Sequence, residues 1–371
     1  MRLSRKQYHI ITATGILSKK RFVLKSILRY MSVGMVSDLA RRAPLSSPIR
    51  RRSDRSLGGT MVRAGLLSLE RRSEGTRLRG AIVTHKVDEH SAMKGSQSAL
   101  PCKPWKPSVV AEPAQVIENR RVCAEYRHLV VSCSKEAAQA QPGQFFQLLC
   151  PHPVGEQPFL RRPMSLYAVD PENRQVEFLY KVTGAGTRGL DTVEVGRTLD
   201  IMGPLGIGFS LDTGWRHIVV VGRGAGLATL APLAQAAQAN GTHVTAVLSA
   251  RNPELIVSAD QFKKHGADVI SVTDSEQTSG PGNVEHILRR LISDGRCDAF
   301  FSCGSARLMR VQQRLAREFN RPGQVAMEQQ MACGIGLCYC CVRDFNVNGE
   351  IVSRRVCWDG PVFNLMEALP S

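Results

Sequence analysis

The stretch Val219-Val220-Val221-Gly222-Arg223-Gly224-Ala225-Gly226 joins an apolar run to a group of glycines. A buried strand that runs into glycines and then a helix is typical of a dinucleotide-binding turn, where the helix N-terminus receives a pyrophosphate. The full G-x-G-x-x-G fingerprint needs glycine at position 227, which is Leu, so a plain strand-to-helix turn remains the alternative. The candidate nucleotide-binding residues here are Gly222, Gly224 and Gly226.

Strand and helix patterns alternate through residues 214–322, which we interpret as an NAD-binding α/β domain. Such alternation predicts a parallel sheet covered by helices on both faces. Cys303 and Gly304 end the last predicted strand of this domain, at the edge where ligands bind in such sheets. The alternative is that Cys303 is a buried thiol with a structural role only. The stretch 249–251, Ser-Ala-Arg, has no acidic residue for a ribose hydroxyl, and Arg251 would accept a 2′-phosphate, so both NAD and NADP remain candidates. The predicted strands are 217–222, 244–249, 268–272 and 299–303, and the predicted helices are 227–239, 260–265, 284–293 and 306–319.

Residues 107–213 read as short β-runs broken by Gly and Pro, with almost no helical periodicity. Six such strands predict a small antiparallel β-barrel. Arg162, Pro163, Met164 and Ser165 begin one predicted strand, and a turn at Gly184, Gly186 and Thr187 follows one hairpin later. An Arg fork, a Ser hydroxyl and backbone N–H groups of a glycine turn can together hold a flavin diphosphate; a strand with Arg on its rim and a plain turn is the alternative. The predicted strands are 116–117, 126–133, 145–150, 164–169, 175–182 and 198–202.

The C-terminal residues 323–371 are dense in cysteine and glycine and poor in apolar bulk. Cys333, Cys338 and Cys341 form C-x4-C-x2-C, and Cys357 follows after fifteen residues, which is the spacing of plant-type 2Fe–2S ligands. Gly334 and Gly336 lie where a loop around a cluster needs unusual dihedrals and N–H groups directed at sulfur. A tetrahedral zinc site is the alternative. Cys340 adjoins a ligand and is left out, because neighbouring side chains rarely point the same way.

The formal charge of +17 is concentrated in residues 1–93, which hold 20 Lys and Arg against 6 Asp and Glu. Because this excess lies outside the segment with fold patterns, we do not expect nucleic-acid binding. Three interpretations of this segment are open: a targeting peptide, a basic tail, or a product of translation from an upstream start, with the protein itself beginning near Met93. We favour the last. No run approaches about 20 apolar residues, so no transmembrane helix is predicted. All 11 cysteines follow residue 101, and this odd, crowded set favours a reducing compartment, the cytoplasm.

The order of these motifs over about residues 108–371 resembles the electron-transfer subunit of NAD-dependent dihydroorotate dehydrogenase, within the ferredoxin–NADP reductase superfamily. The most specific parts are Glu328-Gln329-Gln330-Met331-Ala332-Cys333-Gly334-Ile335-Gly336-Leu337-Cys338-Tyr339-Cys340-Cys341 and the ending Val356-Cys357-Trp358-Asp359-Gly360-Pro361-Val362-Phe363. The resemblance implies that the four iron ligands are Cys333, Cys338, Cys341 and Cys357. It also implies that the flavin motif is formed by Arg162, Pro163 and Ser165. The diphosphate turn would then contain Gly186 and Thr187. The stretch 203–206 resembles the loop that leads to the nucleotide domain.

The resemblance implies FAD, a 2Fe–2S cluster and NAD(H), with NADP(H) not excluded, in a relay of electrons. It also implies a partner, the catalytic flavoprotein subunit of a dihydroorotate dehydrogenase, in a heterotetramer. No residue is predicted to be a general base for an organic substrate. The chain departs from the family at Arg223, where a glycine is usual and where a cation either crowds the dinucleotide or points outward. It departs again at Ser305, where a proline is usual, and in residues 1–93.

Two other functions remain as alternatives. The first is a reductase subunit of the same superfamily that serves another partner, such as a glutamate synthase-like complex, a sulfide dehydrogenase or a ferredoxin. The second is a zinc-stapled binding module that lacks redox activity. Identification of the partner protein would test the first alternative. A purified chain without visible colour would favour the second.

Overall fold

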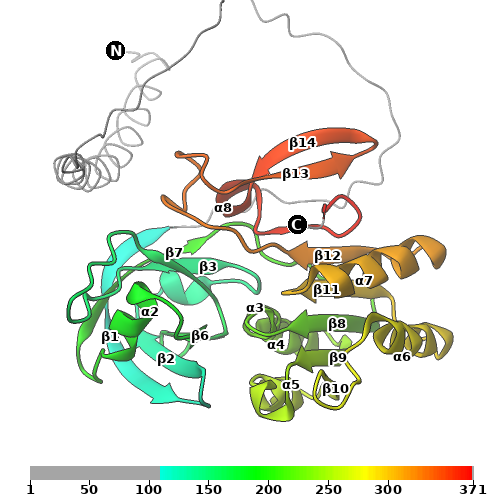
Figure 1. The fold of residues 1–371 in the computed structure, drawn as a ribbon, viewed down its shortest axis with the longest axis horizontal. Coiled ribbons are helices and arrows are strands. Elements are labelled where there is room, and N and C mark those ends of the chain that lie inside the picture. The colour runs from blue at the N-terminus through cyan, green and yellow to red at the C-terminus, as the bar shows by residue number, and fades with distance from the viewer. Residues whose placement is uncertain (1–108, 370–371) are drawn as a thin grey trace, which may run out of the picture. The chain divides into compact units, whose positions relative to one another are not determined.

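A computed structural model describes residues 109–369 of the chain, so the predictions for residues 1–93 lie outside the described residues. The described residues form two large sheets and a small hairpin. Figure 1 shows the first sheet in cyan to green, the second with helices on both of its faces, and the hairpin in red. Among the described residues, no helix is long and apolar enough to cross a membrane.

The first sheet, called here the barrel sheet, is antiparallel and has the order β4-β3-β7-β1-β2-β6-β5. Its two edge strands, β4 and β5, are separated in the chain by only two residues, 166–167, so the sheet must roll until its edges nearly meet. The predicted antiparallel sheet is confirmed as this half-barrel of seven strands, in which β4 and β5 take the place of the single strand predicted over 164–169. The strands are β1 (Val110–Arg121), β2 (Tyr126–Ser132), β3 (Phe145–Leu148), β4 (Arg162–Ser165), β5 (Ala168–Asp170), β6 (Gln175–Lys181) and β7 (Thr198–Leu205).

The interior of the barrel sheet is filled by side chains that alternate along its strands. Phe146 and Phe178 are fully buried there with ring centroids 5.5 Å apart. Leu190 reaches the same core from helix α2 (Ala185–Asp191). The sequence predicted a turn at residues 184–188, and the structure instead begins a helix there. Seven residues are too few to display helical periodicity, and Gly184 is its N-cap.

The second sheet, called here the α/β sheet, has the order β10-β9-β8-β11-β12-β15. Its first five strands are parallel. The sequence predicted β8, β9, β10 and β11 but not β12, and β15 pairs antiparallel with β12, so the sheet is mixed. Strand β12 begins at Gly323, the residue at which the sequence analysis begins the cluster domain. The strands are β8 (His217–Arg223), β9 (His243–Ala250), β10 (Asp268–Thr273), β11 (Ala299–Cys303), β12 (Gly323–Ala326) and β15 (Val362–Asn364).

Helices cover both faces of the α/β sheet (Figure 1). One face packs on α3 (Gly226–Leu230), α4 (Pro232–Ala239) and α5 (Ala259–Lys264), and the other on α6 (Pro281–Ser293) and α7 (Ala306–Glu318). The helix predicted over 227–239 is divided in two, because Pro232 has no N–H for the helical ladder and starts a new helix. Ser305 caps α7 by accepting a hydrogen bond from the Leu308 N–H at 3.4 Å, which gives a structural use for the residue that replaces the family's proline.

Residues 327–369, called here the cluster segment, follow the last parallel strand. They contain the hairpin of β13 (Val342–Val347) and β14 (Glu350–Arg355), the short helix α8 (Val356–Asp359) and strand β15. Phe345, Val356 and Phe363 are buried in a core shared with α6 and α7. The cluster segment is therefore joined to the α/β sheet both by β15 and by this core.

Candidate functional site

The thiols of Cys333 and Cys357 come together although 23 residues separate them in the chain. The Ile335 N–H donates a hydrogen bond to the Cys333 Sγ at 3.5 Å, and the Gly336 N–H donates one to the Cys357 Sγ at 3.2 Å. The loop therefore directs backbone N–H groups at sulfur, as the sequence predicted. This arrangement stabilises thiolates and the metal centres that they hold.

Cys338 and Cys341 complete the group. The Cys357 N–H donates to the Cys341 Sγ at 3.4 Å. A hydrogen bond from the Cys357 thiol lowers the pKa of Cys333, with further help from the Cys338 thiol, and the same bond raises the pKa of Cys357. The four sulfurs that the sequence selected are thus linked to one another through these contacts.

Cys340 has different surroundings from its neighbour Cys341. Its thiol is exposed and lies 3.9 Å from the carbonyl oxygen of Gln330, to which it donates. Cys341 is buried in the core with Cys357. The structure therefore separates Cys340 from the four linked sulfurs.

Two glycines give the cysteine loop its path. Gly334 and Gly336 have φ values of 70° and 78°, in the left-handed region that favours glycine. A Cβ on Gly334 would lie 2.6 Å from the Nε2 of Gln147, and one on Gly336 would lie 2.8 Å from the Trp358 side chain. Both positions therefore exclude a side chain on conformational and steric grounds.

The donor set fits a 2Fe–2S cluster better than a single metal ion. Four thiolates shared between two irons, two for each iron, satisfy such a cluster, whereas structural zinc needs all four around one point. Four cysteines, with backbone N–H groups directed at three of their sulfurs, match the two-iron centre.

The predicted flavin residues Arg162, Pro163, Met164 and Ser165 form the whole of β4, and all four are half-buried. The Arg162 guanidinium lies against Gly186 at the start of α2, where a Cβ would come within 2.6 Å of the Arg162 Nε. The structure thus brings the Arg fork to the first turn of a helix, whose free N–H groups favour phosphate.

Thr187 closes the turn at the start of α2. Its Oγ1 accepts hydrogen bonds from the N–H groups of Thr183 and Gly184, at 2.9 and 3.0 Å. It also donates to the carbonyl oxygen of Gly184 at 3.0 Å. In the described structure, Thr187 therefore holds the shape of this turn.

Ser165 connects the barrel sheet to the α/β sheet. Its Oγ accepts a hydrogen bond from the Thr229 Oγ1 of α3 at 2.9 Å, and Thr229 also contacts the fully buried thiol of Cys303. Burial raises the pKa of Cys303, so it stays a neutral thiol. Thr229 was not predicted from the sequence, because its position depends on packing between the two sheets.

Glu328 is a second residue of the site that was not predicted from the sequence, although it begins the cysteine motif. Its side chain keeps solvent access, while desolvation by the surrounding protein raises its pKa. Its negative charge acts on Cys303 and on the phenol of Tyr126. A carboxyl group therefore lies near the Cys303 thiol and the Tyr126 phenol.

The glycines after β8 meet the end of β11. Gly222 pairs with Cys303 across the two strands. A Cβ on Gly226 would lie 2.7 Å from the carbonyl carbon of Cys303, and one on Gly304 would lie 2.2 Å from the carbonyl oxygen of Arg223. Gly224 has a φ of 57°. The structure therefore packs the predicted nucleotide residues against the Cys-Gly pair at the carboxyl edge of the sheet, where ligands bind in such folds.

Arg223 turns away from the glycine turn and across the ends of neighbouring strands. Its Nη1 donates to the Ser249 Oγ at 2.7 Å, and its Nη2 pairs with the Asp274 carboxylate at 2.6 Å. The Arg223 hydrogen bond, followed by that of Ser279, lowers the pKa of Asp274. Of the two orientations that the sequence left open, the structure shows the one that leaves the glycine turn free.

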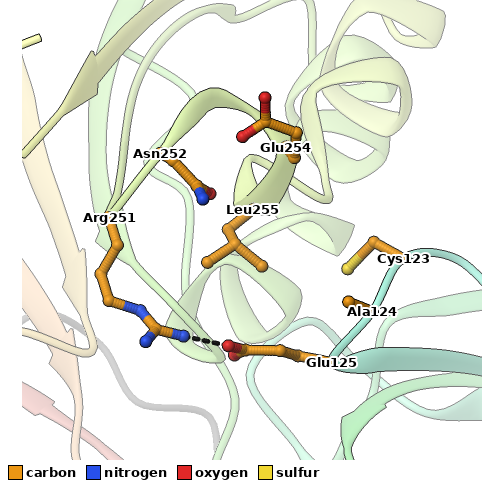
Figure 2. Close-up of a pocket in the computed structure, with 7 residues that line it drawn as sticks. All are labelled: Cys123, Ala124, Glu125, Arg251, Asn252, Glu254 and Leu255. Carbon is orange, nitrogen blue, oxygen red and sulfur yellow. Dashed lines mark hydrogen bonds and ion pairs between the residues drawn. The ribbon is translucent and has the colours of Figure 1, made fainter. Parts of the chain in front are cut away.

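A cavity of about 370 Å³ opens beside the end of β9, between the barrel sheet and the α/β sheet (Figure 2). Arg251 forms an ion pair there with Glu125, which also pairs with Lys181 at 2.6 Å. The hydrogen bonds of Lys181 and Arg251 lower the pKa of Glu125. Arg251 is therefore already partnered by a carboxylate in this structure. The lining residues are Cys123, Ala124, Glu125, Arg251, Asn252, Glu254 and Leu255.

Comparison with known proteins places these features in one family. Residues 328–368 match the iron-sulfur cluster binding domain of dihydroorotate dehydrogenase B. The electron transfer subunit of dihydroorotate dehydrogenase B (NAD(+)) from Streptococcus pneumoniae serotype 4 is 35% identical over 223 residues, which are 60% of this chain and 86% of that protein. The same subunit from S. pneumoniae strain R6 is 33% identical over 254 residues, covering 68% of this chain and 96% of that protein.

A solved structure also resembles this fold. It comes from a study of flavin-based electron bifurcation in an NADH-dependent reduced ferredoxin-NADP oxidoreductase. The similarity has a TM-score of 0.58 and 28% sequence identity, over 68% of this chain and 88% of that one. Together with the sequence matches and the linked cysteines, it leads to one conclusion: the chain belongs to the family of electron transfer subunits of dihydroorotate dehydrogenase B (NAD(+)).

Proposed function

We propose that this chain binds FAD and one 2Fe–2S cluster and relays electrons between NAD(H) and the catalytic flavoprotein subunit of a dihydroorotate dehydrogenase. The observation that carries the proposal is the linkage of Cys333, Cys338, Cys341 and Cys357, with N–H donors directed at their sulfurs. Two subunits of each kind would form a heterotetramer in the cytoplasm.

The flavin would lie along β4, at the junction of the two sheets. Arg162 and the first turn of α2 would hold its diphosphate, and Ser165, held by Thr229, would face its ring. A bound flavin takes a hydride and releases electrons singly. The described residues would position the flavin, and the buried thiol of Cys303 would remain neutral.

The nicotinamide dinucleotide would cross the glycine turn after β8. NAD(H) is the form that the site supports, because Arg223 and Arg251 are each paired with a carboxylate, Asp274 and Glu125. A 2′-phosphate would have to compete with those carboxylates for either cation. The names of the relatives, which specify NAD(+), agree with this assignment.

The exposed side of the cysteine loop would meet the catalytic subunit. Leu337, Tyr339 and Trp358 are all more than half exposed, and they lie next to the exposed Cys338 or to Cys357. Apolar side chains gathered at one place on a surface are typical of an interaction site. Electrons would leave or enter the chain through this face.

A second candidate partner follows from the solved structure that resembles this chain, an NADH-dependent reduced ferredoxin-NADP oxidoreductase. A reductase subunit for such a complex would carry the same cofactors. The protein that purifies with this chain distinguishes the two functions.

One sample of protein purified without oxygen tests the cofactor assignment. We expect a visible absorbance spectrum of flavin and iron–sulfur together, with about two irons, two sulfides and one FAD for each chain. Zinc in place of iron, with no flavin, would contradict the proposal and favour the zinc-stapled module.

A further inference from the structure

Gln147 lies in the middle of β3 and is completely buried. Neither its Oε1 nor its Nε2 has a hydrogen-bond partner among the described residues, and it is the one side chain there with two such buried polar atoms. A buried amide without partners is unfavourable, because it has given up its hydrogen bonds to water. The amide of Gln147 therefore calls for a partner that the protein itself does not supply.

Other buried glutamines nearby are satisfied by the protein. Gln144, three residues earlier, accepts from the Gln141 N–H at 2.7 Å and donates to the carbonyl oxygen of Gly206 at 2.8 Å. Gln324 donates to the carbonyl oxygen of Ser210 at 2.7 Å. Gln312 leaves its Oε1 unpaired, but its Nε2 donates to the Ser302 Oγ at 2.7 Å. Among the described residues, Gln147 is thus the glutamine whose amide lacks a partner at both atoms.

The side chain of Gln147 points to the cysteine loop. Side chains alternate along a strand, so Gln147 shares a face with Phe145, which lies in the same core as Cys341 and Cys357. The Nε2, Cγ and Cδ of Gln147 lie within 2.6 to 3.1 Å of where a Cβ of Gly334 would be. Gly334 directly follows Cys333. The amide therefore faces the backbone between two proposed iron ligands, and the absence of a side chain on Gly334 permits this approach.

Gln147 also adjoins the flavin strand. It is the register partner of Pro163 in β4, one residue from Arg162. It thus stands between the strand proposed to hold FAD and the loop proposed to hold the cluster. This is the side of the cluster across which electrons exchanged with the flavin would pass.

We propose that the Gln147 amide donates a hydrogen bond to a sulfur of the 2Fe–2S cluster and thereby sets the reduction potential of that cluster. The inference rests on the proposed function, because it assumes the cluster. Hydrogen bonds to cluster sulfurs raise the potential, since they stabilise the more negative reduced state. Gln147 is a positioning residue for electron exchange and takes no part in bond making.

The test compares Gln147→Met with the parent chain, each purified with its partner subunit. Met has a similar length but no donor, so we expect the cluster to form with a lower midpoint potential and altered g-values in electron paramagnetic resonance. Loss of one hydrogen bond should change the ratio of reduced to oxidised cluster about tenfold at a fixed potential, which is about 59 mV for a one-electron couple. Gln147→Leu, which also has no donor, is expected to lower the potential by a similar amount and serves if the Met variant does not fold.

Gln144→Met is the matched control. It removes a buried amide that has protein partners, so we expect a lower melting temperature with an unchanged cluster potential. Unchanged potentials and g-values in both Gln147 variants would overturn the inference while leaving the relay intact. A parent chain without iron and sulfide would instead refute the proposed function.

Discussion

Cys340 and Cys341 are neighbours in the chain, yet only the Cys341 sulfur is buried beside Cys357. This difference depends on the left-handed turn at Tyr339, whose φ is 56°. Which cysteine can act as a ligand therefore depends on the path of the loop as well as on the spacing of the cysteines.

Single Ser substitutions test the ligand assignment. Cys333→Ser, Cys338→Ser, Cys341→Ser and Cys357→Ser are each expected to abolish most of the iron–sulfur absorbance, because a cluster needs four thiolates. Cys340→Ser is the matched control and should retain both the visible band and about two irons for each chain. Bleaching by Cys340→Ser, with a coloured Cys341→Ser variant, would show that the assignment is wrong. Visible absorbance and iron analysis are the measurements.

The sequence predicted the cysteine set and the flavin strand because each is contiguous or regularly spaced in the chain. It could not predict Thr229 or Gln147 as parts of the site. Thr229 reaches Ser165 only when α3 packs against β4, and Gln147 faces Gly334 only when the barrel sheet packs against the cluster segment. Neither contact leaves a local pattern.

At the scale of elements, the carboxyl ends of β8, β9 and β10 bring two arginines to one edge of the sheet. Arg223 ends β8 and Arg251 follows β9, and each is held by a carboxylate. The acceptors come from a distant part of the chain in both cases. The positive charges of Arg223 and Arg251 at this edge of the sheet are therefore largely neutralised by their carboxylate partners.

Removal of the paired carboxylates is expected to improve the use of NADPH. Asp274→Asn should free Arg223, and Glu125→Gln should free Arg251, so that either cation can bind a 2′-phosphate. One such charge-assisted hydrogen bond is worth about tenfold in the ratio of NADPH to NADH kcat/KM. Because the Arg223 hydrogen bond lowers the pKa of Asp274, the pair stays ionised through neutral pH, and the parent's ratio should be constant there.

Glu254→Gln is the control for that experiment, since Glu254 lines the same cavity as Arg251. It removes a negative charge without releasing a recorded ion pair. A rise in NADPH use equal to that of the other variants would mean that general charge, and not the freed arginines, determines the preference. Steady-state kinetics with both dinucleotides provides the comparison.

Most elements were predicted because apolar runs and glycines mark them, as in β8, β11 and α7. The antiparallel β15 was not predicted. It has only three residues, and its partner β12 lies more than 35 residues earlier, so its pairing depends on the tertiary path of the cluster segment. The sequence also gave no local signal of the mixed character of the sheet.

At the scale of the whole molecule, the described unit places three proposed sites in sequence: the glycine turn, the flavin strand and the cysteine loop. The last of these reaches the surface at Leu337 and Cys338, which are both exposed. The proposed relay would therefore exchange electrons with a partner at this surface.

A charge at the exposed face should weaken assembly with the catalytic subunit. Leu337→Asp is expected to lower the affinity roughly tenfold or more, because a buried apolar contact is replaced by a carboxylate that must be desolvated. Val195→Asp is the control, since Val195 is 65% exposed but lies on the barrel sheet side of the chain. Equal affinity of both variants, with intact cluster spectra, would exclude the cysteine loop as the docking face. Binding is measured by titration of the purified subunits.

Strand β15 has a further effect, on solubility. All four residues of β12 are buried, and β12 would form the margin of the α/β sheet if β15 were lost. Unpaired N–H and C=O groups along an apolar margin promote sheet extension between copies of a chain. Strand β15, which belongs to the same cluster segment as the cysteines, is therefore expected to protect the rest of the molecule from aggregation.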